Sequence, residues 1–68
     1  MTYPYLYNKL SLIYKKSDLE EVISEALEHL TTIEIISENE GYYSPTKISE
    51  KEGMFESISN LVEEYLET

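Results

Sequence analysis

The sequence contains no cysteine, no arginine and no tryptophan, and it has only two glycines and two prolines. Without cysteine there is neither a disulfide framework nor a thiolate zinc site. No apolar run approaches the roughly 18 residues of a membrane-spanning helix, and residues 1–7 lack the basic start and apolar stretch of a signal peptide. These absences predict a cytoplasmic protein that does not bind membranes.

The chain has the length of one small domain, residues 1–68, and a core of that size supplies only marginal stability. An apolar content of 41% is typical of a folded chain rather than a disordered one. Because no disulfide reinforces the core, we expect association with a second copy or with a larger protein to add stability.

Basic residues are scarce, since 14 acids face 5 lysines and give a net charge of −9. The charge is also unevenly placed. Residues 1–16 contain three lysines and no acid, a local charge of +3, whereas residues 17–68 carry all the acids and two lysines, a local charge of −12. Such a chain is repelled by phosphate backbones and anionic membranes and is attracted to basic surfaces.

The first segment, residues 4–15, has the pattern of a helix. Pro4 suits a first helical position, where its missing N–H costs nothing. Apolar residues then recur three and four positions apart, as they do on one helical face. The alternation of Tyr3, Tyr5 and Tyr7 would also fit a short strand.

A second helix is predicted to follow at once. Ser17 and Glu20 have the spacing of a capping box, in which each side chain satisfies a backbone donor of the first turn. Between residues 19 and 30 the apolar side chains form one stripe at helical spacing.

After residue 30 the pattern changes to that of a hairpin. Residues 31–36 are rich in β-branched side chains and predict a strand. Residues 37–41 read as a turn, in which Gly41 can adopt a positive φ. Residues 42–48 can return as a second strand, which Pro45 confines to the edge of a sheet because it cannot donate a ladder hydrogen bond.

The last segment is another amphipathic helix. Ser49 and Glu52 repeat the capping-box spacing, and Gly53 weakens the turn that follows. The apolar residues between positions 54 and 65 define its inner face.

Together these segments predict an α+β fold in α-α-β-β-α order, with amphipathic helices packed on a small hairpin. The alternative is an all-α three-helix bundle, in which the second helix continues to Glu38 and residues 42–46 form a loop.

Composition argues against catalysis and against a metal or cofactor site. Nucleophilic or acid–base chemistry needs several groups that converge in a pocket, and the chain offers one histidine, His29, without cysteine or arginine. No H-E-x-x-H motif is present, and the oxygen-bearing side chains of residues 38–40 do not have EF-hand spacing. We therefore expect neither enzymatic activity, nor a cofactor, nor a dedicated metal site.

Residues 40–46 resemble the tip and return strand of the wing in winged-helix proteins. That likeness covers about a third of the chain when the adjoining helix is included. Binding of DNA would require a basic recognition face, and the second predicted helix carries acids there instead. We therefore expect no direct contact with nucleic acid.

Acidic residues recur along the outward faces of two predicted helices. A helical repeat of three or four residues spaces them by about 4.5–6 Å, which is comparable to the phosphate spacing along a DNA strand. An ordinary solvated face is also charged, but it usually mixes lysine with glutamate. The two acidic stripes are Asp18, Glu21, Glu25 and Glu28 in the second helix, and Glu52, Glu56, Glu63 and Glu67 in the last.

Seven tyrosines form the second signal, because tyrosine is enriched at protein interfaces. Helical spacing predicts that Tyr7, Tyr14 and Tyr65 belong to the core. Four further side chains are candidates for an exposed docking or dimer patch: Tyr5, Leu12, Tyr42 and Tyr43.

These patterns predict a non-enzymatic, cytoplasmic regulator or inhibitor that occupies a basic, nucleic-acid-binding partner through acidic helix faces, as a DNA mimic would. The alternative is a small structural or adaptor subunit that forms a homodimer, or docks on another protein, through its tyrosine and leucine surface.

Overall fold

Three helices and one hairpin follow one another in the order that the sequence predicts. The structure is a computed structural model and describes residues 1–47 and 53–67. Its elements are α1 (Tyr3–Ile13), α2 (Leu19–Thr32), β1 (Ile36–Asn39), β2 (Tyr42–Pro45) and α3 (Met54–Leu66). The chain therefore has a small α+β fold, and the all-helical alternative is wrong.

Helix α1 is amphipathic and begins one residue before Pro4, which occupies its first turn. Leu6 and Leu10, one turn apart, are fully buried. The helix ends at Ile13, two residues before the predicted boundary. The alternation of tyrosines at the start of the chain therefore does not mark a strand.

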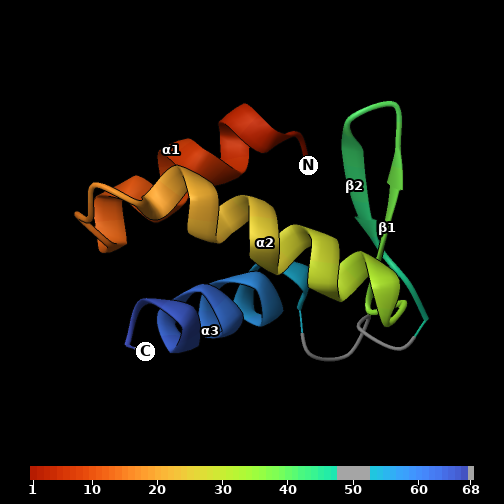
Figure 1. The fold of residues 1–68 in the computed structure, drawn as a ribbon. Helices are drawn as coiled ribbons and strands as arrows, with labels where there is room; N and C mark the ends of the chain where they lie inside the picture. Colours follow the sequence, from red (N-terminus) through yellow and green to blue (C-terminus); the bar gives the residue numbers. More distant parts are fainter. Residues whose placement is uncertain (48–52, 68) are drawn as a thin grey trace.

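Helix α2 is the central element of the fold. In Figure 1 it crosses the molecule between α1 and α3, and the hairpin stands beside its C-terminal end. Its apolar residues form one buried stripe, as the spacing predicts. The members of that stripe are Leu19, Val22, Ile23, Ala26, Leu27 and Leu30. They form one cluster with Leu6 and Leu10 of α1, Ile36 of β1, and Met54, Ile58 and Val62 of α3.

The predicted capping box at the start of α2 is wrong. Asp18, and not Ser17, is the N-cap residue, and no side chain caps this end by a hydrogen bond. Glu20 consequently lies at the second helical position, too early to complete the motif. Glu20 and Glu21 instead place negative charge in the first turn, where the helix dipole favours it.

The predicted strand over residues 31–36 is also wrong, because α2 continues to Thr32. The Thr31 hydroxyl donates a hydrogen bond to the Leu27 carbonyl at 2.7 Å, and the Thr32 hydroxyl donates to the Glu28 carbonyl at 2.9 Å. These bonds to the preceding turn let threonine remain within a helix despite its β-branched side chain.

A Schellman motif ends α2 and turns the chain toward β1. The Glu34 amide donates to the Thr31 carbonyl at 3.2 Å, and the Ile35 amide donates to the Leu30 carbonyl at 3.0 Å. This geometry requires a left-handed residue after the C-cap, a position that glycine usually fills. Here Glu34 occupies it, with φ of 63°.

The hairpin has a shorter turn than predicted. Strands β1 and β2 pair in antiparallel register from Ile36–Pro45 to Asn39–Tyr42, so only Glu40 and Gly41 lie between them. Both have positive φ, 53° and 82°, as a type I′ turn requires. β2 ends at Pro45, and position 48, the end of the predicted second strand, lies outside the described residues.

Residues 1 and 2 pair with the outer edge of β2. The Met1 nitrogen donates to the Tyr43 carbonyl at 2.6 Å, and the Tyr43 amide donates to the Met1 carbonyl at 2.6 Å. The backbone of Tyr43 therefore points away from β1. Hydrogen-bonded and non-hydrogen-bonded pairs alternate in an antiparallel ladder. Pro45 is two residues after Tyr43, so its nitrogen also points away from β1. The missing N–H of proline therefore costs the pairing with β1 no hydrogen bond. The predicted edge position of this proline is confirmed.

Helix α3 closes the core on the other side of α2. Its N-cap is Gly53, so this glycine precedes the helix instead of weakening its first turn. The predicted capping motif at positions 49 and 52 lies outside the described residues. The Tyr14 hydroxyl lies 3.1 Å from the Ser59 hydroxyl oxygen and links the end of α1 to α3. No helix within residues 1–47 and 53–67 has the length and apolar character needed to cross a bilayer.

Two leucines of α1 provide a matched test of the core. Leu10 is fully buried, whereas Leu12 has 79% of its surface exposed. We expect Leu10→Ala to cost about 2–5 kcal/mol of unfolding free energy, which is comparable to the whole stability of a domain this small. Leu12→Ala should cost less than about 0.5 kcal/mol. Urea denaturation followed by circular dichroism measures both, and equal losses would contradict this packing.

The left-handed residue after α2 predicts an unusual stabilising substitution. A non-glycine residue in this conformation costs about 1–2 kcal/mol, so Glu34→Gly should raise the unfolding free energy by about 0.5–1 kcal/mol. Glu25→Gly, which removes the same charge from inside α2, should instead lower it by about 1 kcal/mol. If both substitutions destabilise the protein in urea, the Schellman motif is not the helix end.

Candidate functional site

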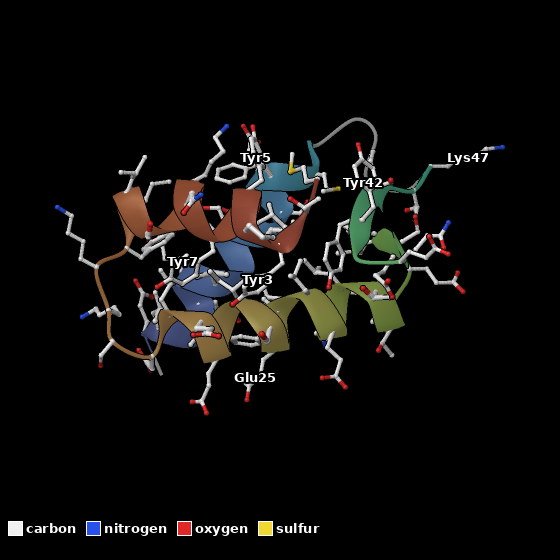
Figure 2. The ribbon with its side chains drawn as sticks, turned by 90° about the horizontal axis from the view of Figure 1, so that it is seen from above. Tyr3, Tyr5, Tyr7, Glu25, Tyr42 and Lys47 are labelled. Atoms are coloured by element: carbon white, nitrogen blue, oxygen red, sulfur yellow. The ribbon has the colours of Figure 1, made fainter. Side chains whose placement is uncertain are left out.

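The outward face of α2 is acidic from Asp18 to Glu28. Asp18, Glu21, Glu25 and Glu28 are all exposed, and Figure 2 shows the Glu25 side chain pointing away from the rest of the molecule. Residues 18–32 contain no lysine or arginine. The face therefore presents carboxylates to solvent without basic side chains between them.

Helix α3 carries the second predicted stripe. Glu56, Glu63 and Glu67 are exposed, whereas Glu52 lies outside the described residues. The last turn of α3 contains no basic residue, although the negative end of the helix dipole favours one there. Glu63 and Glu67 thus lie where negative charge is unfavourable for the helix itself.

The side of the molecule opposite Glu25 carries exposed aromatic and apolar side chains. Figure 2 shows Tyr5 and Tyr42 on that side, and 46% and 57% of their surfaces are exposed. Leu12 is two helical turns beyond Tyr5 on the same face of α1. The Lys9 ammonium lies 5.1 Å from the centre of the Tyr5 ring and 5.0 Å from that of Phe55, so this face carries positive charge.

Two tyrosines differ from their predicted places. Tyr7 was expected in the core, but 37% of its surface is exposed and its ring stacks on that of Tyr3 at 6.3 Å. Tyr43 was expected beside Tyr42, but successive strand residues point to opposite faces, and Tyr43 lines a groove instead. Tyr14 and Tyr65, also expected in the core, are half-buried and pack against it.

This groove lies between α2 and the hairpin and has a volume of about 300 Å³. Three parts of the chain form it, which bring together residues that are distant in sequence. Its lining residues are Tyr3 of α1; Ser24, Leu27, Glu28, Thr31 and Thr32 of α2; and Glu38 and Tyr43 of the hairpin. None of these residues is basic.

The protons of several groove hydroxyls are engaged within the protein. The Tyr3 hydroxyl donates to the Glu20 carbonyl at 3.2 Å, and the hydroxyls of Thr31 and Thr32 donate to carbonyls of the preceding helical turn. Ser24 forms a side-chain hydrogen bond with Tyr3. The oxygens of these side chains therefore remain as acceptors.

Burial in the groove affects both tyrosines. Partial burial raises the pKa of the Tyr3 phenol, the hydrogen bond with Ser24 opposes that rise, and the Glu20 carboxylate adds to it. Partial burial also raises the pKa of the Tyr43 phenol, and the Glu38 carboxylate adds to it. Both phenols therefore stay protonated at neutral pH.

Sequence reasoning identified the acidic faces but missed the groove. Thr31 and Thr32 were assigned to a strand, and Tyr3 was considered only as part of a first helix or of a short strand. The usable signal was the i, i+4 bonding capacity of two consecutive threonines at a helix end. Nothing in the local sequence connects Tyr3 with Glu38.

No cluster of three or more histidine, aspartate or glutamate side chains within the described ranges could hold a metal ion. Comparison with models of protein families, with curated proteins and with solved structures found no match for the chain. The resemblance of residues 40–46 to a wing thus gains no support, and function must be argued from the surfaces themselves.

The two raised phenol pKa values predict a specific loss of stability in alkali. A group whose pKa is higher in the folded state stabilises that state below the unfolded pKa, about 10 for tyrosine, and the stability is lost as pH rises through the folded pKa. We expect the unfolding free energy to fall between about pH 9 and pH 11, and to fall less in a Tyr3→Phe, Tyr43→Phe double variant. Tyr42→Phe, at an exposed position of the same strand, should leave the loss unchanged.

Proposed function

We propose that the protein is a non-enzymatic cytoplasmic regulator that binds a basic surface of a partner protein. The acidic faces of α2 and α3 make the contact, and the partner surface is one that otherwise binds nucleic acid. The protein thereby inhibits its partner as a DNA mimic.

The outward face of α2 is the observation that carries this proposal. Its four carboxylates are exposed at helical intervals, and no lysine or arginine lies within the helix to neutralise them. The first-turn acids have a local reason, since they complement the helix dipole. Glu25 and Glu28 lie beyond that turn and have no such reason, so their placement supports a role outside the protein.

The end of α3 supports the same proposal. Acids in the last turn of a helix oppose its dipole, and each costs about 0.3–1 kcal/mol at low ionic strength. A face that served only solubility would gain from lysines at these positions, which also form i, i+4 pairs with glutamate. Glu63 and Glu67 thus favour external recognition over internal stability.

The mechanism is steered association followed by occlusion. A strongly negative protein accelerates encounter with a basic surface, and the rate falls as salt screens the charges. Once bound, the helix faces occupy the positions that phosphates would take. Duplex DNA and the protein therefore compete for the same partner.

Charge reversal on α2 tests the proposal. A Glu21→Lys, Glu25→Lys, Glu28→Lys variant should weaken partner binding by at least about tenfold, because like charges then oppose across the contact. The immobilised protein is used to retain proteins from an extract of the cells that produce it, and retained proteins are eluted by a salt gradient. Added duplex DNA should displace the specific partner.

The control changes net charge equally at other exposed positions. Glu34→Lys, Glu40→Lys, Glu64→Lys has the same total charge as the α2 variant and should retain the partner. Circular dichroism confirms that both variants are folded. If both lose the partner equally, net charge and not the α2 face governs binding. If neither loses it, the acidic-face proposal is wrong.

A second candidate function is that of a structural or adaptor subunit. The exposure of Tyr5, Leu12 and Tyr42 favours it, because these large side chains lie on elements that otherwise pack into the core. On this alternative, the surface forms a homodimer or docks on a larger protein, and acidity provides only solubility.

The oligomeric state tests this alternative. Sedimentation equilibrium should show a dimer that forms with rising concentration and is insensitive to salt, since apolar contacts are not screened. Tyr5→Ala or Leu12→Ala should weaken it, whereas the α2 charge reversal should not. A monomer at all concentrations would contradict homodimer formation.

A further inference from the structure

The groove between α2 and the hairpin differs from the acidic faces in that it is concave and presents aromatic rings together with acceptors. Glu28 of α2 and Glu38 of β1 line the groove from its two walls, and one carboxylate oxygen of Glu38 accepts a hydrogen bond from the Gly41 amide at 2.9 Å. A carboxylate accepts hydrogen bonds but cannot donate them. The groove therefore has negative charge on two sides of one hollow.

The hydroxyl groups add acceptors and few donors. Tyr3 donates its proton to the Glu20 carbonyl, Thr31 to the Leu27 carbonyl and Thr32 to the Glu28 carbonyl. The two threonine oxygens keep lone pairs for a ligand, whereas the Tyr3 oxygen also takes part in the hydrogen bond with Ser24. Tyr43 contributes a ring together with a hydroxyl that can donate or accept a hydrogen bond. A ligand that fits this pattern brings donors and positive charge.

A guanidinium group has this chemistry. It carries five N–H donors in one plane, has no acceptor, is always charged and stacks on aromatic faces. An ammonium group offers three donors but no plane to stack. The rings of Tyr3 and Tyr43 and the acceptors around them therefore suit arginine better than lysine.

From this complementarity we infer that the groove receives an arginine side chain of the partner protein. The inference rests on the proposed function and deepens it, because it names one anchoring residue type within the basic surface. The acidic faces bring the partner close by long-range attraction, and the groove fixes its orientation by short-range contacts.

Amide chemical shifts of the isotope-labelled full chain test this inference, with Nα-acetyl-argininamide as the probe. Shifts should concentrate at Thr31, Thr32, Glu38 and Tyr43 and should saturate together, with a dissociation constant of about millimolar order. The citrulline analogue has the same shape without charge and should give no such shifts at equal concentration. Shifts of equal size with citrulline would overturn the inference.

Two substitutions of glutamate by glutamine provide a matched pair of variants. Glu38→Gln removes charge from the groove while keeping an oxygen that can accept the Gly41 amide, and it should weaken binding by about threefold. Glu40→Gln removes the same charge from the neighbouring turn and should leave binding unchanged. Equal weakening by both, or shifts spread along the exposed acids of α2, would mean diffuse counterion attraction and would overturn the inference.

Binding of free L-arginine shows whether the guanidinium ligand of the groove is a side chain of a protein or the free amino acid. Its α-carboxylate finds no basic partner among the groove residues, so it should bind no more tightly than the blocked probe. Tighter binding of free arginine would overturn the assignment to a partner protein. Glu28 belongs to both the acidic face and the groove, whereas Glu21 and Glu25 do not line the groove. A Glu21→Lys, Glu25→Lys variant therefore tests the acidic face alone, and failure of the groove arms leaves its result standing.

Discussion

The fold depends on the apolar stripe of α2, because every other element packs against it or against its neighbours. α1 covers it from one side and α3 from the other, and Ile36 of β1 joins the same cluster. Without disulfides, this burial is the main source of stability. It also sets the surfaces, because the side of α2 that does not enter the core faces solvent, and that side carries Glu20, Glu21, Glu25 and Glu28.

Periodicity predicted what one helix can determine alone. The buried stripe of α2, the inner face of α3 and the element order all follow from apolar spacing, and so do the exposed carboxylates on the opposite faces. Boundaries were less accurate, because they depend on backbone hydrogen bonds that spacing does not specify. Ser17 has the spacing that a capping box requires, yet the helix begins after Asp18. Thr31 and Thr32 are β-branched and predicted a strand, yet their hydroxyls form hydrogen bonds within the helix.

The groove shows where sequence reasoning ends. Its walls come from α1, α2 and the hairpin, so it exists only after these elements have packed. Neither Tyr3 nor Glu38 belongs to a motif, and their proximity follows from the direction in which the Schellman motif sends the chain after α2. The acidic faces, by contrast, were visible as a repeat within one helix. What the sequence could not show was that acids from two elements flank a hollow with aromatic rings.

The pairing of Met1 with Tyr43 links the integrity of the hairpin to that of α1. These residues are separated by 42 positions, so the contact depends on the docking of everything between them. The outer edge of β2 is covered only while α1 stays in place. A change that loosens α1 therefore uncovers unpaired strand backbone as well as apolar surface, and such edges template association with other chains. For this protein, partial unfolding at one end is a route to aggregation as well as to loss of stability.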